Sequence, residues 1–305
     1  MRRGIPVLAA VGLVVAAALA VTGAVPAEPA ERALSPSSFA FAIGNGTLDG
    51  NPGAVGSRYA RFDLVVVDGE EAKAGEVEAI EAGGAVVLAY LSVGTVEKWR
   101  GWYPRLKRYR LKAWRDWKDE WYADASKAGY RDELVAIAGD EILDKGFDGL
   151  FLDNTDMVET RSHRRQRKGM GKLVAGLDEL VDADGRLLFT QNGAPGMLEG
   201  YGDAVDPLIG HFDGWNREDV SWTYDFDRRR YVRNRNGDRS EALAELDRIH
   251  TAGLVTTATD YVGLTNQSTG AECESVANAE GVDALDYVAD IGLTKRAVAA
   301  NPPDC

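Results

Sequence analysis

Short apolar stretches recur along the chain, and each one is bounded by Gly, Asp or Asn. Within them apolar residues follow one another without the strict alternation that a sheet with one wet face shows. Unbroken apolar runs of about four to eight residues are typical of parallel strands that are covered on both faces. We therefore predict eight strands, within residues 39–45, 62–69, 85–94, 149–154, 187–193, 211–218, 255–263 and 284–291.

The segments between these runs carry helical patterns. Apolar side chains fall close to helical spacing, and Gly146 and Gly253 provide stop signals behind two of the segments. Strands that alternate with helices predict a parallel sheet, and eight such units predict a closed (β/α)8 TIM barrel in a single α/β domain. The clearest predicted helices lie within residues 70–83, 130–145, 173–181 and 240–252.

A weak internal repeat marks the beginning of three predicted strands. Phe-Asp pairs stand at Phe62-Asp63, Phe147-Asp148 and Phe212-Asp213. Each Asp lies at the entrance of its strand, at the end of a barrel that is associated with stability rather than with catalysis. We therefore expect a structural role for the three aspartates.

The first 27 residues are predicted to form a signal peptide. Arg2 and Arg3 precede an apolar run over residues 5–24, and small residues follow it. That order is typical of a cleavable export signal. An uncleaved membrane anchor is the alternative, because the run approaches the length that spans a bilayer. Residues 28–37 would then be a short linker and residues 38–305 the barrel of a secreted or cell-surface protein, without a stable membrane partner once the signal is cleaved.

Charge and cysteine content narrow the function further. The net charge of −13 argues against nucleic acid as a partner. Cys273 and Cys305 predict one disulfide between the last loop and the C-terminal residues of an exported protein, with two free thiols as the alternative. The three histidines show no metal-ligand spacing with them. We expect neither a metal nor a cofactor.

One connection is too long for a simple crossover. Residues 95–129 hold five of the seven tryptophans, together with three tyrosines. Long loops of compact domains are often functional, and aromatic side chains suit a ligand cleft. The alternative is that these aromatics only pack the connection onto the barrel.

Polar residues gather where the predicted strands end. The active sites of enzymes with this fold lie at the carboxyl end of the barrel. Carboxylates there suit glycoside hydrolysis, although Ca²⁺ or Mg²⁺ binding uses similar ligands. A Ser-His-Asp triad and a nucleotide-binding loop are not indicated. The residues at the strand ends are Asn45, Asp68, Ser92, Glu97, Asp153, Asn154, Asp156, Gln191, Asn192, Glu218, Asp219, Asp260 and Tyr261.

Five segments occur in an order that resembles a known family. They are Tyr-Leu-Ser-Val-Gly at 90–94 with Glu97, Gly-Phe-Asp-Gly-Leu-Phe-Leu-Asp-Asn at 146–154, Gln-Asn-Gly at 191–193, Asp-Gly at 213–214 with Glu-Asp at 218–219, and Asp-Tyr at 260–261. Over residues 38–293 the chain is similar to glycoside hydrolase family 114, the endo-α-1,4-polygalactosaminidases. The resemblance implies Asp153 and Glu218 as the catalytic pair, and our hypothesis assigns Asp153 as nucleophile and Glu218 as general acid/base.

The resemblance also suggests how substrate is held. The family pattern has a Glu two positions before Glu97, where this chain has Thr95. This departure leaves two alternatives open: hydrolysis of another α-linked glycan, or a non-catalytic carbohydrate-binding barrel. A cationic amino-sugar polymer would suit the acidic chain, because opposite charge steers association. The candidates for substrate binding are Asp68, Ser92, Glu97, Asn154, Gln191, Asn192, Asp260 and Tyr261.

Overall fold

The structure is a computed structural model that describes residues 34–202, 205–264 and 270–305. Residues from Leu34 to Cys305 form one unit. The predicted signal peptide, and residues 28–33 of the predicted linker, lie outside the described residues. Within the described ranges no helix has the length and apolar character needed to cross a membrane.

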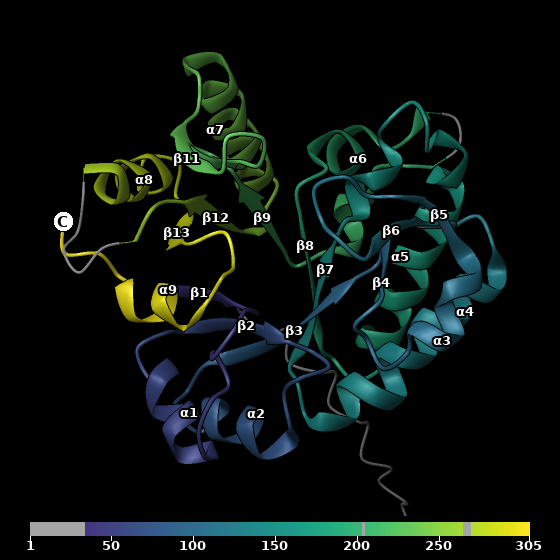
Figure 1. Cartoon of the computed structure of the whole chain (residues 1–305), viewed down its shortest axis with the longest axis horizontal. Coiled ribbons are helices and arrows are strands. Elements are labelled where there is room, and N and C mark those ends of the chain that lie inside the picture. The colour runs from purple at the N-terminus through teal and green to yellow at the C-terminus, as the bar shows by residue number, and fades with distance from the viewer. Residues whose placement is uncertain (1–33, 203–204, 265–269) are drawn as a thin grey trace, which may run out of the picture. The chain divides into compact units, whose positions relative to one another are not determined.

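Eight parallel strands form one sheet, and helices lie between successive strands in the sequence (Figure 1). The strand order is β1-β2-β3-β7-β8-β9-β12-β13. Each strand falls inside one of the eight predicted apolar runs, so the predicted α/β barrel is confirmed. The strands are β1 (Phe39–Ala42), β2 (Leu64–Asp68), β3 (Val86–Ser92), β7 (Gly149–Asp153), β8 (Leu187–Gln191), β9 (Gly214–Glu218), β12 (Val255–Tyr261) and β13 (Leu285–Ala289).

The helices include those predicted and several shorter ones. The predicted segment 130–145 continues beyond α4 as a π-helix (Ile137–Ile142) and a 3-10 turn, and it ends at Gly146 with a φ of 105°. The left-handed conformation favours glycine, so the predicted stop is confirmed. The α-helices are α1 (Pro52–Tyr59), α2 (Ala74–Glu81), α3 (Tyr103–Leu106), α4 (Ala128–Ala136), α5 (Arg167–Asp182), α6 (Ala194–Glu199), α7 (Asn236–Thr251), α8 (Gly270–Glu280) and α9 (Lys295–Ala300).

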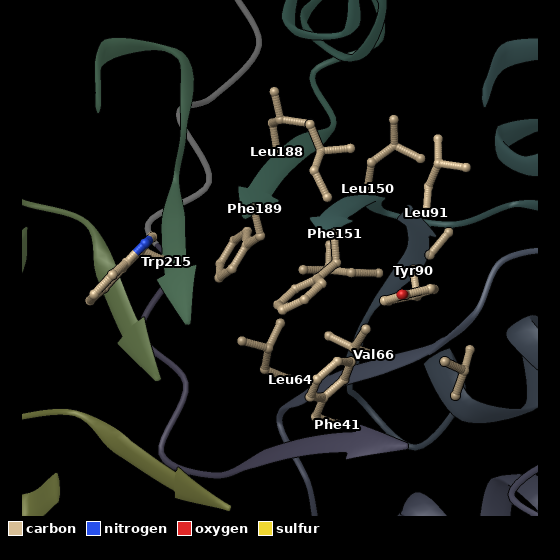
Figure 2. Close-up of a cluster of buried hydrophobic side chains, with 14 of the residues drawn as sticks. Phe41, Leu64, Val66, Tyr90, Leu91, Leu150, Phe151, Leu188, Phe189 and Trp215 are labelled. Atoms are coloured by element: carbon tan, nitrogen blue, oxygen red, sulfur yellow. The ribbon is translucent and has the colours of Figure 1, made fainter. Parts of the chain in front are cut away.

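Side chains of successive strand residues point alternately into the barrel and toward the helices. In Figure 2, Phe151 and Phe189 point toward the barrel interior, whereas their neighbours Leu150 and Leu188 point away from it. The rings of Phe41 and Phe151 lie 5.0 Å apart, so aromatic side chains from different strands meet in the interior. This double burial explains why the strands show no polar alternation in the sequence.

The first and last strands meet at the seam of the barrel. The Phe39 ring of β1 lies 6.0 Å from the Tyr287 ring of β13, edge to face. Just beyond β1, Gly44 N–H donates to the Leu293 carbonyl at 3.0 Å. A Cβ on Gly44 would lie 1.7 Å from the Gly292 carbonyl oxygen, so only glycine permits this approach of the two backbones.

The aspartates at the strand entrances tie neighbouring strands together. Asp148 accepts a hydrogen bond from Val87 N–H at 2.9 Å, and Asp213 accepts one from Leu188 N–H at 2.8 Å. Each side chain therefore extends the hydrogen bonding of the sheet at its amino end. The predicted structural role of Asp148 and Asp213 is confirmed by these bonds.

Two predictions about connections are refined by the structure. Cys273 and Cys305 are joined by a disulfide, as predicted, but Cys273 lies in helix α8 and not in a loop. The long connection after β3 is an ordered antiparallel sheet in the order β4-β6-β5, formed by Thr95–Glu97, Glu120–Ala123 and Arg110–Ala113. A second hairpin, β10 (Trp222–Asp225) and β11 (Arg230–Arg233), follows β9.

Candidate active site

A cavity of about 410 Å³ opens at the carboxyl ends of the barrel strands. The long connection and the hairpin β10–β11 contribute further walls to it. Eight carboxylic acids and a single guanidinium group are among its described lining residues. The charged groups that line it are Asp68, Glu71, Glu97, Arg100, Glu120, Asp153, Asp156, Glu218 and Asp219.

The chain turns sharply directly behind three of the strands that carry the site. Asn154, Asn192 and Asp219 follow the last residues of β7, β8 and β9, and their φ angles are 64°, 55° and 56°. Asn and Asp tolerate the left-handed region better than other residues with a Cβ. These turns bring the side chains at the strand ends and those just beyond them to the same cavity.

Asp153, the last residue of β7, is held by four hydrogen bonds. Tyr90 O–H donates to its Oδ2 at 2.5 Å, and Gln191 Nε2 donates to its Oδ1. The backbone N–H of Asn154 donates at 2.6 Å and its side-chain amide at 3.0 Å. Such donors favour the ionised carboxylate. They act against burial and the nearby Glu218, which together raise the pKa of Asp153 above its ordinary value.

A buried network orients the amide of Gln191. Thr257 and Thr259 hydroxyls donate to Asn216 Oδ1 at 2.8 and 3.1 Å, and Asn216 Nδ2 donates to Gln191 Oε1 at 3.3 Å. Gln191 thereby presents its Nε2 group, and not its oxygen, to Asp153. Strands β8, β9 and β12 thus cooperate in fixing one donor to this carboxylate.

Glu218, the last residue of β9, has fewer donors. Tyr261 O–H donates to its Oε1, and Asn192 Nδ2 donates to its Oε2 at 2.8 Å. Burial and the neighbouring charge of Asp219 raise the pKa of Glu218 above its ordinary value. Burial also raises the pKa of Tyr261 well above its ordinary value, so that hydroxyl remains a donor.

The two carboxyl groups therefore occupy different environments. Four donors support a negative charge on Asp153, whereas Glu218 has two and lies beside another acid. Environments of this kind separate a carboxylate that stays ionised from one that retains a proton. The arrangement can supply one anionic and one proton-donating group to a bound ligand.

Arg100 neutralises one part of the cavity wall. Its Nη1 lies 2.7 Å from both oxygens of Asp68, and its Nε donates to Glu97 Oε2 at 2.8 Å. All three side chains are buried, with at most 8% of each exposed. We call Asp68, Glu97 and Arg100 the paired cluster, because each carboxyl group forms an ion pair with the guanidinium.

Besides the exposed Glu71, three other carboxyl groups in the cavity take part in none of the ion pairs found among the described residues. Burial and the nearby Glu97 raise the pKa of Glu120 to about 8. Burial and Asp153 raise the pKa of Asp156 to about 7, and burial raises that of Asp219 to about 6. Asp219 Oδ1 is buried without a hydrogen-bond partner. We call Glu120, Asp156 and Asp219 the uncompensated carboxyls.

Most of the predicted site residues come together in this cavity. Both predicted catalytic residues line it, and so do six of the eight predicted binding residues: Asp68, Glu97, Asn154, Gln191, Asn192 and Tyr261.

The other two predicted binding residues lie behind the cavity wall. Ser92 is buried and bonds to Thr95 Oγ1 at 2.6 Å, while Asp260 accepts the backbone N–H groups of Ser221 and Trp222 at 2.8 and 3.0 Å. The geometry does not support substrate contact by either one. Both side chains instead fix neighbouring turns.

Three residues of the site escaped the sequence reasoning. Tyr90 belongs to the family motif at 90–94, but its position within β3 gives no sign that its hydroxyl reaches Asp153. Arg100 and Glu120 lie in the long connection, away from the strand ends. The tryptophans flagged that connection as functional, so its charged residues were the available signal.

Aromatic side chains form much of the remaining wall. Trp99, Trp114 and Trp117 from the long connection line the cavity, as predicted for at least one of its tryptophans, whereas Trp102 is buried. In the part of the chain described by the structure, the large hydrophobic side chains classed as exposed are Trp99 (54%), Trp117 (38%) and Phe226 (37%). All three face this one cavity, which is typical of a binding surface rather than of packing.

The described residues contain no group of three or more His, Cys, Asp or Glu side chains arranged to hold a metal ion. A parallel barrel with carboxylic acids at its carboxyl end is the arrangement that barrel glycoside hydrolases use.

The family follows from sequence comparison. The model of glycoside-hydrolase family GH114 matches residues 22–206, and the chain belongs to this family. Asp153 lies inside the matched range and Glu218 lies beyond it. A protein of Deinococcus radiodurans described as uncharacterized is 31% identical over 112 residues, which is 34% of this chain and 36% of that protein. The match thus spans about a third of that relative's length.

Two solved structures share the fold. The glycoside hydrolase domain of PelA from Pseudomonas aeruginosa superposes with a TM-score of 0.67 at 21% identity, over 85% of this chain and 96% of that one. Ega3 from Aspergillus fumigatus, solved in complex with galactosamine, gives a TM-score of 0.60 at 15% identity, over 85% and 91% of the two chains.

Proposed function

We propose that this protein hydrolyses α-1,4-linked galactosamine-containing polysaccharide, with Asp153 and Glu218 as the catalytic pair. The observation that carries the proposal is that two half-buried carboxyls in different environments line one cavity at the end of a GH114 barrel. The galactosamine bound to Ega3 supports the substrate class by analogy of fold.

In the proposed reaction Glu218 begins protonated and Asp153 ionised. Asp153 attacks the anomeric carbon while the glycosidic C–O bond breaks, and Glu218 passes its proton to the leaving oxygen. Glu218, now ionised, takes a proton from water, and the resulting hydroxide displaces Asp153 from the anomeric carbon. The sugar leaves with a new hydroxyl, and both side chains return to their starting states.

The uncompensated carboxyls support a substrate that carries positive charge. Burial and other nearby carboxyl groups raise the pKa values of Glu120, Asp156 and Asp219, so each is stabilised in its ionised form when a cation approaches. The ammonium group of a de-acetylated amino sugar supplies such a cation, and it would also give Asp219 Oδ1 the donor that it lacks. A neutral N-acetylated sugar would leave these charges uncompensated.

The proposal includes export to the cell surface or medium through residues 1–27. The arginines and apolar run of the sequence support a signal peptide, and a polymer that cannot cross a membrane is met outside the cell. Detection of the mature chain in the medium, with a new N-terminus close to residue 28, is the expected result. An uncleaved chain found only in the membrane fraction contradicts it.

The decisive assay is release of oligosaccharides from de-acetylated and from fully N-acetylated α-1,4-galactosaminan. We expect release from the first polymer and little from the second, and loss of release in Asp153→Asn with polymer binding retained. Binding without turnover by the wild type would favour the carbohydrate-binding alternative. Turnover of a different α-linked glycan, and of no galactosaminan, would change the proposed substrate but leave the proposed reaction in place.

A further inference from the structure

The tips of two hairpins that are about a hundred residues apart in the sequence meet beside the cavity. One tip joins β5 to β6 and the other joins β10 to β11. Arg115 Nη2 of the first tip forms an ion pair with Asp227 of the second. The rings of Trp117 and Phe226 lie edge to face, with centroids 5.5 Å apart.

These tips border a second hollow of about 380 Å³. Tyr224 and Phe226 line both this hollow and the main cavity, so the two spaces share a wall. The rest of its lining comes from the hairpin tips: Arg115, Asp116, Asp227 and Arg229.

We propose that the second hollow is a distal sugar-binding site, which holds a further residue of the glycan chain that is cleaved at Asp153 and Glu218. This inference rests on the proposed function for the identity of the chain. It assigns the hairpin tips a role in binding long substrates, so long oligomers should bind more tightly and be cut more efficiently than short ones.

The lining has the chemistry that a sugar requires. Rings of Tyr224 and Phe226 offer apolar surface for the C–H face of a pyranose, and Phe226 is 37% exposed. Asp116 and Asp227 can accept hydrogen bonds from hydroxyl or ammonium groups, while Arg115 and Arg229 can donate to hydroxyls. Sugar sites combine apolar rings with a few polar groups in this way.

The shared wall identifies the occupant. A ligand in the main cavity that extends past Tyr224 and Phe226 enters the second hollow without leaving the protein surface. A linear polymer does this by its nature, whereas a single small molecule has no reason to bridge the two spaces. The occupant is therefore another unit of the same glycan.

The test is a series of α-1,4-linked galactosamine oligomers of increasing length, assayed for both affinity and turnover. Because Phe226 also lines the main cavity, Phe226→Ala should reduce affinity and kcat/KM on every oligomer, and the loss should be about tenfold larger on long oligomers than on the shortest ones that are cut. Arg228→Lys is the matched control, because Arg228 lies in the same turn, lines neither hollow and bonds to Asp225. It should leave both parameters unchanged at every length.

The outcomes separate this inference from the proposed function. Equal losses on short and long oligomers in Phe226→Ala, or no dependence of affinity on length in the wild type, overturn the distal site even if the wild type hydrolyses the polymer. If the wild type binds long oligomers more tightly but hydrolyses nothing, and Phe226→Ala abolishes this dependence on length, the distal site stands and the proposed hydrolase activity is refuted. A matching loss in Arg228→Lys attributes the effect to the turn's folding and also overturns the distal site.

Discussion

Two groups of carboxyls face the same cavity, and they differ in how their charge is balanced. The paired cluster has Arg100 between Asp68 and Glu97, at 2.7 and 2.8 Å. The uncompensated carboxyls, Glu120, Asp156 and Asp219, take part in no ion pair among the described residues, and their pKa values are raised. A buried charge is tolerated when it is paired, and otherwise the group retains a proton.

This difference indicates a division of labour within one cavity. The paired cluster fixes the long connection to the end of β2, because Arg100 and Glu97 come from the connection and Asp68 from the strand. The uncompensated carboxyls form no ion pair among the described residues and line the cavity that a cationic ligand would enter. Asp153 and Glu218 share their raised pKa values but have specific donors that set their roles.

Substitution of a catalytic carboxyl should have the largest effect. Glu218→Gln keeps the shape of the side chain but removes the proton that the leaving group needs, so kcat should fall by about 10²–10⁴-fold. Initial rates on de-acetylated galactosaminan measure this loss. Asp213→Asn, at the opposite end of the barrel, is the control and should stay within about twofold of the wild type. Similar losses in both variants would contradict the assignment.

Removal of the Arg100 guanidinium, the one such group among the described residues that line the main cavity, should have the next largest effect, and it should lower stability. Arg100→Met leaves Asp68 and Glu97 buried without a cation, which should lower the free energy of unfolding by about 3–5 kcal/mol. Urea denaturation measures the change. Arg105→Met removes a half-exposed pair with Glu141 and should cost less than about 1 kcal/mol. Equal costs would show that the paired cluster is no more structural than the surface pair.

The uncompensated carboxyls predict a pH dependence of stability with a definite sign. Raised pKa values mean that the folded protein binds protons more tightly than the unfolded chain, so the free energy of unfolding should fall as pH rises from about 4 to 8. Each group contributes a slope of at most about 1.4 kcal/mol per pH unit. Glu120→Gln should make this pH dependence less steep, most clearly toward pH 8. Glu78→Gln, on the exposed surface of α2, is the control and should leave the pH dependence of stability unchanged.

The unfolding free energy of wild type and both variants at several pH values provides the measurement. An unchanged slope in Glu120→Gln would mean that this carboxyl is compensated by a group that the described structure does not pair with it.

Ionic strength should have the smallest effect, on the order of a few-fold in kcat/KM. An excess of carboxyls in the cavity attracts a cationic polymer, and salt screens that attraction. Rates on de-acetylated polymer at increasing NaCl concentrations measure it, with a neutral oligomer as the control substrate if one is cut. A rate that does not change with salt would remove the steering contribution and leave only contact recognition.

The strands and their order were predictable because burial on both faces leaves unbroken apolar runs, as in 62–69 and 85–94. The entrance aspartates and the disulfide were predictable from repetition and from the cysteine count. The catalytic pair was proposed from a resemblance combined with strand ends. Short helices such as α6 and α9 carry too few apolar residues to give a clear period, and they were not singled out.

What the sequence by itself determined was the barrel, since strand burial and helix periodicity are local patterns that survive in one dimension. It also determined that acids gather at one end, because parallel strands all point the same way. Only the tertiary structure decided which acids are paired. Arg100 meets Asp68 across 32 positions, and Tyr90 meets Asp153 across 63. Charge compensation depends on distances of a few ångströms that no local pattern encodes, so the division between the two groups of carboxyls came from the fold.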